Sequence, residues 1–330
     1  MEYYSTDDEH IPVWKFQLRD GSITQWLEVN VDANTGGIVS SQDLKKRLYL
    51  YGDRTTQQKV EDGFSRIVNP ENTQSSPNGW TEGYKLTGNN VLTILEGGKT
   101  FEMATKSVFG GIFDPLLPPQ TPKNIMAGAV NAFYVANMVH DVFYAYGFTE
   151  PAGNFKRITS KGWNRGGPMI HELTHGLSSR LTGGARTKLC MAETESRGLS
   201  EGYSDIIALI FMAKPEDTRN TNKVMGEYVK ALEEYTNHYN LGEIWATMLE
   251  VYWNFVEKYG FSANLHDATQ KKGNIMFLQI LVGTLMIQPC KLTFDSARDA
   301  MLAADYAYYG GIHKHLIRQG FAKRGLGSIS

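Results

Sequence analysis

The residues with the clearest chemical potential form the pentapeptide at positions 171–175, whose sequence H-E-L-T-H follows the pattern H-E-x-x-H. On a helix, His171 and His175 lie one turn apart on one face, so both imidazoles can reach a single Zn²⁺. Glu172 lies about 100° further round, where it can hold a water on that metal, take its proton and pass the proton to a leaving amine. The pattern predicts a catalytic zinc site, and a chance match on a helix surface is the alternative interpretation of the motif alone.

A catalytic zinc needs a third protein ligand and an open fourth position. Glu201 and Asp205 follow His175 by 26 and 30 positions, at the head of the next expected helix, and their spacing places them on one face. Glu201 can ligate the metal while Asp205 accepts the second N–H of a ligating histidine. Acidic residues also suit an ordinary helix N-terminus, and alone this pair would indicate nothing more. Beside H-E-x-x-H, both carboxylates have a defined role in a His₂Glu site.

The elements that must position these residues are predominantly helical from about residue 125 onward. Apolar residues recur at helical spacing, which predicts helices over 127–146, 168–181, 199–213, 242–259, 275–287, 295–306 and 313–322. In the fourth of these, Trp245, Met248, Tyr252 and Phe255 form a core stripe. The first 45 residues instead alternate, predicting strands over 13–19, 26–32 and 38–39, and residues 46–125 are rich in turns. The sequence therefore predicts an α+β fold.

Composition excludes several functional classes. The chain has 330 residues, and 33 Lys+Arg against 35 Asp+Glu leave a net charge of −2, which does not favour nucleic-acid binding or a polybasic membrane anchor. The longest nearly apolar run, 275–287, has 13 residues, whereas a bilayer span needs about 20. Residues 1–9 are acidic and polar, so the chain as given carries no secretory signal.

Two cysteines allow at most one disulfide. Cys190 and Cys290 are 100 positions apart, and a bridge closing such a loop stabilises a protein by up to about 4–5 kcal/mol in the chain-entropy model. The bridge requires the two Cα atoms to lie within about 7 Å of each other.

A closer resemblance covers nearly the whole chain. Residues 171–184, followed by 198–205 with the sequence G-L-S-E-G-Y-S-D, resemble the fungalysin family of secreted fungal zinc metallopeptidases. Other segments similar to this family are 69–80, 139–148, 242–246, 288–290, 297–300 and 321–327. Residues 12–16 and 32–36 resemble the end of the family's propeptide.

The resemblance implies a thermolysin-like metallopeptidase with zinc between two lobes. Residues 1–45 would be a propeptide remnant forming a small sheet, 46–185 a mixed β/loop N-terminal lobe ending in the zinc helix, and 186–330 a helical C-terminal lobe. It also implies secretion, protein or peptide substrates, and inhibition by the chain's own propeptide. We expect a monomer with no nucleic-acid or membrane partner.

The chain departs from the family in three places. Only residues 156–167 connect to the zinc helix, where the family has a long insert whose edge strand pairs with the substrate, so one wall of the cleft is expected to be incomplete. Tyr239, with His238 beside it, replaces the family's oxyanion-stabilising histidine. A one-residue step turns a side chain by about 100° in a helix, so we expect Tyr239 rather than His238 to be the donor. His315 stands where family members have a cysteine, which leaves Cys290 without its usual partner.

Three functional hypotheses remain at this stage. The first is a zinc endopeptidase with Glu172 as general base, and the second is a non-catalytic homologue that keeps zinc but has a truncated cleft. The third is a zinc aminopeptidase, for which the chain shows no motif that would anchor a substrate amine. His140 and Asp141 would suit a second metal pair, but a buried structural histidine is the favoured interpretation.

Overall fold

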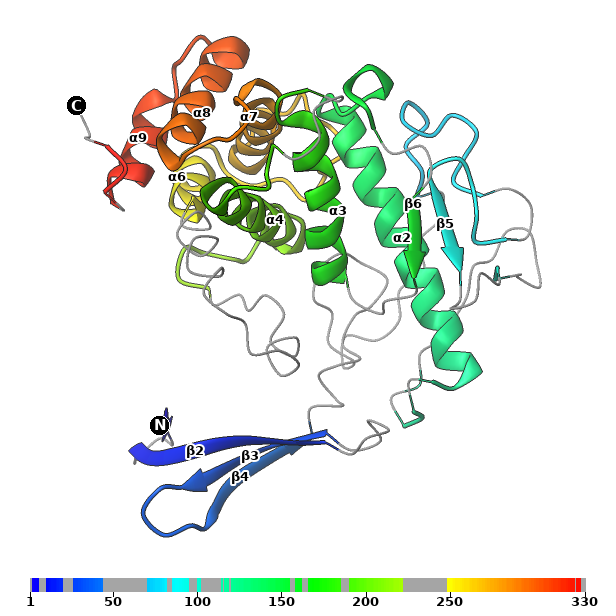
Figure 1. Ribbon diagram of the computed structural model, residues 1–330, viewed down its shortest axis with the longest axis vertical. Coiled ribbons are helices and arrows are strands. Elements are labelled where there is room, and N and C mark those ends of the chain that lie inside the picture. Colours follow the sequence, from blue (N-terminus) through cyan, green and yellow to red (C-terminus); the bar gives the residue numbers. More distant parts are fainter. Residues whose placement is uncertain are drawn as a thin grey trace.

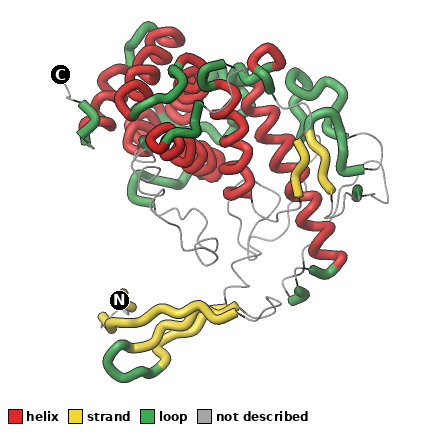
Figure 2. Tube along the Cα trace, viewed as in Figure 1, coloured by secondary structure: helices red, strands yellow, loops and turns green. Residues whose placement is uncertain are grey.

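The structure is a computed structural model of the chain, and it describes residues 2–5, 10–19, 26–43, 70–81, 85–94, 100–101, 114, 116–118, 120–154, 158–161, 166–184, 190–221, 248–323 and 325–327. Helices dominate from residue 122 onward, and strands occur in two separate places (Figures 1 and 2). This mixed helix and strand content agrees with the sequence-based prediction. No helix in the described ranges is long and apolar enough to span a membrane.

The N-terminal strands form a four-stranded antiparallel sheet in the order β1-β2-β3-β4. Their bounds are β1 Glu2–Ser5, β2 His10–Arg19, β3 Trp26–Asp32 and β4 Ile38–Asp43. The last three confirm the strands that the alternating pattern predicts, and β1 adds one that was not predicted. Figure 1 shows this sheet apart from the helices.

One face of the four-stranded sheet is apolar and open. The register pairs Trp14 with Val31, Val31 with Ile38, and Phe16 with Val29, so these side chains share a face. Trp14, Phe16 and Ile38 are 50%, 49% and 69% exposed. The alternating pattern therefore produced a sheet face on which three apolar side chains, Trp14, Phe16 and Ile38, are exposed while Val29 is buried.

A second, two-stranded sheet lies beside the first long helix. β5 (Val91–Ile94) pairs in parallel with β6 (Ile158–Lys161), and both lie next to α2 (Pro122–Ala145) in Figure 1. β6 falls within residues 156–167, the 12-residue connection that stands in place of the family's long insert. Four residues suffice for a short strand here, because a neighbour is available to pair with it.

The helical body is built around one helix, α7 (Gly273–Ile287), most of whose residues are buried. The helices are α2, α3 (Gly166–Leu181), α4 (Thr194–Met212), α6 (Leu249–Tyr259), α7, α8 (Phe294–Tyr309) and α9 (Lys314–Ala322), with a short η2 at Glu150–Ala152. α7 is apolar on every side and packs against α6 and α8. Its first residue must be glycine, because a Cβ at Gly273 would lie 2.2 Å from the carbonyl oxygen of Phe255.

The observed helices agree with the predicted ones apart from their ends. α4 begins at Thr194, five residues before the predicted start, because the polar residues and glycine of 194–198 hide the apolar period. α6 is described from Leu249, so the predicted helical residues 242–248 lie outside the described part of this helix. In the described part of the predicted core stripe, Met248, Tyr252 and Phe255 are buried, as expected.

The packing of α3 against α4 creates the site. Ile170, Leu173 and Leu177 are buried along α3 at spacings of three and four residues. α4 contributes its own buried residues at helical spacing, Leu199, Tyr203, Ile206 and Ile210. The two helices lie against each other, side by side in Figure 1, and this contact fixes the polar residues on their adjoining edges.

A disulfide and a hydrogen-bond chain secure this helix pair to the end of α7. Cys190 and Cys290 are bonded, with Cα atoms 4.6 Å apart, which answers a question that the sequence left open. Tyr203 donates its hydroxyl hydrogen to Gln288 Oε1 at 2.8 Å, and Gln288 Nε2 donates to Thr182 Oγ1 at 2.6 Å. The beginning of α4 and the end of α3 are thus held by groups just beyond α7.

Asp141 anchors a loop onto α2. Its carboxylate is fully buried and accepts hydrogen bonds from Ser76 Oγ at 2.6 Å, Trp80 Nε1 at 2.8 Å and the backbone N–H of Asn72 at 2.9 Å. His140 Nδ1 also lies 3.0 Å from this carboxylate, and its side chain is buried. His140 is therefore a buried histidine bonded to a structural carboxylate.

Candidate metal centre

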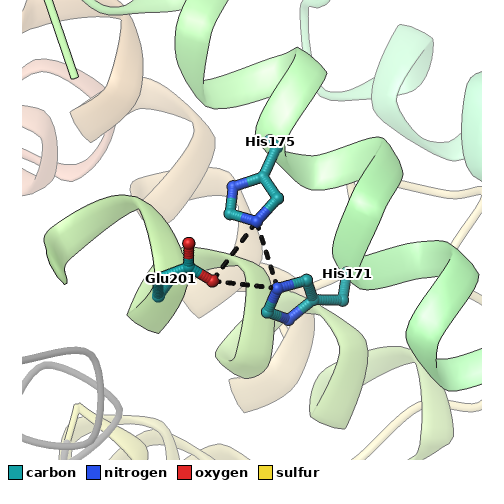
Figure 3. Close-up of side chains that lie close together, drawn as sticks. All are labelled: His171, His175 and Glu201. Atoms are coloured by element: carbon teal, nitrogen blue, oxygen red, sulfur yellow. Dashed lines mark hydrogen bonds and ion pairs between the residues drawn. The ribbon is translucent and has the colours of Figure 1, made fainter. Parts of the chain in front are cut away.

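Three potential ligand atoms converge where α3 and α4 adjoin. His171 Nε2 lies 3.1 Å from His175 Nε2 and 3.2 Å from Glu201 Oε2, and His175 Nε2 lies 3.4 Å from the same oxygen. Figure 3 shows the two imidazoles leaving α3 one turn apart and the carboxylate approaching from α4. The spacing of 171 and 175 puts both rings on one face, and the apolar contact of the two helices brings Glu201 to them.

The distances suit a tetrahedral metal. A zinc ion with bonds of about 2.0–2.1 Å holds neighbouring ligand atoms roughly 3.3 Å apart. Three separations of 3.1–3.4 Å match that value, and they come from two nitrogens and one carboxylate oxygen, a donor set that zinc prefers. Within the described ranges this is the one group of three or more such residues close enough to hold a metal.

The second nitrogen of each histidine is already engaged. His171 Nδ1 donates to Asp205 Oδ1 at 2.8 Å, which leaves the Nε2 lone pair for a metal. His175 Nδ1 lies 3.0 Å from Ser200 Oγ and 3.2 Å from Ser204 Oγ. Asp205 therefore fixes the tautomer and orientation of His171, whereas the two serines orient the ring of His175. These three residues and Glu201 all lie on α4.

Two serines in this support were not predicted. Ser200 and Ser204 flank the ring of His175, and Ser178 Oγ lies 3.3 Å from Ser200 Oγ. From the sequence, only a histidine partner at Asp205 is expected, and the hydrogen bond of Asp205 shows that it serves His171. The sequence position of these serines could have indicated their role. Ser200 directly precedes Glu201, and Ser204 follows Ser200 by four residues, which places both serines on one face of the helix.

The electrostatics of the site reflect mutual pairing of its groups. Burial lowers the pKa of His171, but hydrogen bonds to Asp205 and Glu201 outweigh burial and raise that pKa to about 9. Burial raises the pKa of Glu201, but hydrogen bonds to His171 and His175 outweigh it and hold the pKa well below its usual range. Without a metal, the two carboxylates therefore favour a protonated His171, and a metal must displace that proton.

The remaining predicted site residues fall in different places. Glu172 follows His171 on α3 and its side chain is exposed, so it is accessible to a substrate. Tyr239 and His238, the two predicted oxyanion donors, lie outside the described residues. The structure thus brings together His171, His175, Glu201 and Asp205.

A pocket of about 340 Å³ opens beside the centre. His175 and Glu201 contribute to its wall, together with Ser200, Ser179 and Arg197. The disulfide residue Cys190 also lines it, so its shape is tied to the covalent link between the start of α4 and the end of α7.

Two histidines from an H-E-x-x-H helix and a glutamate from the following helix form a group that could hold a metal ion, with the donor set that a His₂Glu metallopeptidase centre requires. Residues 52–169, 166–234 and 229–330 match the model of the family described as Fungalysin metallopeptidase (M36). The chain therefore belongs to the fungalysin family. Its members are zinc enzymes, and zinc is the cofactor that the converging triad fits.

Several fungal proteins are similar to the chain. It is 30% identical over 408 aligned positions to "Extracellular metalloproteinase 5" of Arthroderma benhamiae, covering 93% of this chain and 64% of the relative. It is 29% identical to "Extracellular metalloproteinase MEP" of Pyricularia oryzae, covering 99% of this chain and 66% of that protein. "Extracellular metalloproteinase" of Pyrenophora tritici-repentis is 30% identical, and the match covers 98% of this chain and 64% of that protein. The chain thus spans 64–66% of the length of these curated relatives.

Proposed function

We propose that this protein is a zinc-dependent endopeptidase that hydrolyses peptide bonds of extracellular proteins. The observation that carries the proposal is the convergence of His171 Nε2, His175 Nε2 and Glu201 Oε2 at 3.1–3.4 Å, with an accessible Glu172 beside them. Family membership and the names of the extracellular relatives support the substrate class and the location.

Each residue has a distinct role in this proposal. Zinc, when bound, supplies Lewis acidity that polarises the scissile carbonyl and acidifies the attacking water. His171, His175 and Glu201 hold the ion, and Asp205 orients the ring of His171 through the 2.8 Å contact with Nδ1. Glu172 accepts the proton of the attacking water and transfers it to the leaving amine, so its carboxylate returns to the ionised form.

A second oxyanion donor completes the mechanism. The scissile carbonyl oxygen becomes negatively charged, and removing one such donor costs on the order of 3–4 kcal/mol in other hydrolases. We assign this role to Tyr239, whose phenol stays protonated to a pH of about 10. Comparison of Tyr239→Phe with His238→Ala in a peptide-hydrolysis assay tests the choice: loss of activity in the histidine variant alone would transfer the role to His238.

The substrate would be held by a thermolysin-like cleft between the lobe of residues 46–185 and the lobe of residues 186–330. β6 supports this arrangement, because β5 covers one of its edges and, among the described strands, nothing pairs with the other. An extended peptide can add to such an edge through backbone hydrogen bonds.

Residues 1–45 would act as a propeptide remnant that inhibits the catalytic part of the same monomer. Two observations support this: the family match begins at residue 52, and the N-terminal sheet leaves an apolar face with Trp14 and Phe16 exposed. An open apolar face of this kind suits packing against another surface. Proteolytic cleavage after residue 45 should therefore increase peptidase activity, and unchanged activity would contradict inhibition.

Casein hydrolysis by the purified chain tests the central proposal. We expect activity that 1,10-phenanthroline abolishes and added Zn²⁺ restores, together with one zinc per chain by metal analysis. Bound zinc without hydrolysis, before and after cleavage at residue 45, would favour the alternative of a non-catalytic zinc-binding homologue. Release of single N-terminal residues instead of internal cleavage would favour an aminopeptidase.

A further inference from the structure

The pocket next to the metal centre contains a cation that the mechanism does not use. Arg197 lines the pocket together with the ligands His175 and Glu201, on the side that also contains Cys190, Met191 and Ser179. It precedes Glu201 by four residues on α4, so the two side chains lie on the same face of that helix.

Arg197 has no structural partner in the described part of the chain. Its side chain is exposed, and no described acceptor lies within hydrogen-bonding distance of its guanidinium. The acidic residues nearest in sequence are engaged elsewhere: Glu193 pairs with Lys291 at 2.7 Å, and Glu195 accepts the backbone N–H of Phe294 at 2.7 Å. The guanidinium is therefore available to a ligand that enters the pocket.

Local helix energetics also give no reason for this arginine. Arg197 lies within the first turn of α4, where the helix dipole is positive and favours anions. A cation at this end is disfavoured, so stability of the helix does not explain its presence. Binding of an anionic ligand does explain it, because the guanidinium and the N-terminal end of the helix both contribute positive electrostatic potential.

The acidic residue beside Arg197 in the pocket does not neutralise it. The carboxylate of Glu201 is directed at the two Nε2 atoms, at 3.2 and 3.4 Å, and does not pair with Arg197. A group that satisfies the pocket must be an anion that can accept from a planar donor fork, which is the chemistry of a carboxylate.

We propose that Arg197 is a specificity-determining residue that binds a carboxylate of the peptide substrate close to the scissile bond. This inference rests on the proposed function, since it presumes that a peptide occupies the zinc cleft. The carboxylate can come from an Asp or Glu side chain or from a C-terminus near the cleavage site. The pocket, of about 340 Å³, has room for either group, and the disulfide at Cys190 keeps its wall in place.

Peptide binding tests the assignment without requiring turnover. In the zinc-loaded Glu172→Gln background, the probes are amidated hexapeptides carrying one Glu at successive positions, their Gln counterparts, and the Gln peptides with free C-termini. We expect at least one carboxylate peptide to bind roughly 10-fold to 100-fold more tightly than its neutral counterpart, the range for a charge-assisted arginine contact. Arg197→Gln should remove this preference, and Arg197→Lys should restore only part of it.

Lys314→Gln supplies the matched control. Lys314 is an exposed cation on α9, so its loss changes the net charge equally without altering the pocket. Equal binding of the Glu, free-acid and neutral peptides would overturn the proposal, and so would an equal loss of preference in Lys314→Gln. The zinc content and melting temperature of each variant establish that it is folded. If Arg197→Gln does not fold, Arg197→Lys provides the test.

Cleavage of the same peptides by the chain with intact Glu172 separates this inference from the proposed function. A carboxylate preference in binding without any cleavage would refute the peptidase while leaving the role of Arg197 intact. Cleavage of Glu and Gln peptides with equal kcat/KM, unchanged in Arg197→Gln, would refute the role of Arg197 while leaving the peptidase intact.

Discussion

The pairs His171–Asp205 and His313–Asp305 use the same contact in different surroundings. The Nδ1–Oδ1 distances are 2.8 Å and 2.7 Å. His313 and Asp305 are almost completely buried, and the imidazole is enclosed by the rings of Phe255, Tyr259 and Tyr309 at centroid distances of 5.0–5.4 Å. His171 instead faces His175 and Glu201, two residues that line an open pocket.

The difference shows that a histidine bonded to an aspartate is not by itself a sign of function. In both pairs the carboxylate fixes the ring, and the Asp305 carboxylate also accepts the backbone N–H of His313 at 3.0 Å, which makes it part of the local fold. What distinguishes His171 is that two further ligand atoms converge on its Nε2 and that the site is accessible. The variants below separate these two uses of the same contact.

The largest expected effect is the loss of zinc from His175→Ala. Two remaining ligands cannot hold the ion as three do, so zinc content should fall from one per chain to nearly none, and hydrolysis should vanish with it. His313→Ala is the comparison variant and should retain the ability to bind zinc while melting at a lower temperature. Metal analysis after dialysis measures zinc content in both variants, and unchanged zinc in His175→Ala would refute the ligand assignment.

Glu172→Gln should have the next largest effect, and only on the chemical step. A glutamine at this position would keep the shape of the side chain but could not accept a proton, so kcat should fall by a factor of roughly 10²–10⁴. Zinc content and melting temperature should match those of the parent protein. Activity within a few-fold of the parent would exclude Glu172 as the general base.

The two aspartates should fail in opposite ways. Asp205→Asn is expected to weaken zinc binding roughly 10-fold to 100-fold with little loss of fold stability, because Asp205 supports a ligand at the protein surface. Asp305→Asn is expected to leave zinc affinity unchanged but to lower the free energy of unfolding by about 3 kcal/mol, since it breaks a buried pair. Chelator competition and urea unfolding on both variants measure these quantities. If both variants lost zinc affinity and fold stability alike, the two aspartates would not differ in role.

A smaller effect is expected from the serines around His175. Ser200→Ala removes the hydroxyl 3.0 Å from Nδ1, but Ser204 remains at 3.2 Å and can take over the contact. Zinc affinity should therefore fall by no more than about 10-fold in each single variant, and by more in the double variant than the two single losses predict. Additive losses in the double variant would show that the serines do not substitute for each other.

The mildest effect concerns acid stability through Asp141. Burial raises the pKa of this carboxyl, but the hydrogen bonds from His140, Ser76, Asn72 and Trp80 outweigh burial and lower the pKa from its ordinary 3.8. A lowered folded pKa stabilises the fold above pH 3.8, and this contribution is lost as the pH falls through the folded value. In Asp141→Asn, unfolding free energy measured between pH 7 and pH 3 should depend less on pH than in the parent.

The sequence by itself predicted the three residues that could hold a metal ion, His171, His175 and Glu201. H-E-x-x-H fixes the geometry of two histidines, because a helix places positions four apart on one face whatever surrounds it. The apolar period located the helices from α2 to α9, and alternation located β2 to β4. Local periodicity carries these features, so no knowledge of distant contacts was needed to predict them.

Only the tertiary structure decided which distant residues meet. Ser200 and Ser204 face His175 because α4 packs on α3 with one particular rotation, and no local pattern encodes that rotation. Cys190 reaches Cys290, and Arg197 comes to line a pocket beside the metal ligands, through the same packing. β6 pairs with β5 although the two strands lie far apart in the sequence. Such contacts depend on how whole elements pack, which is why the candidate metal ligands could be predicted from spacing and the pocket beside them could not.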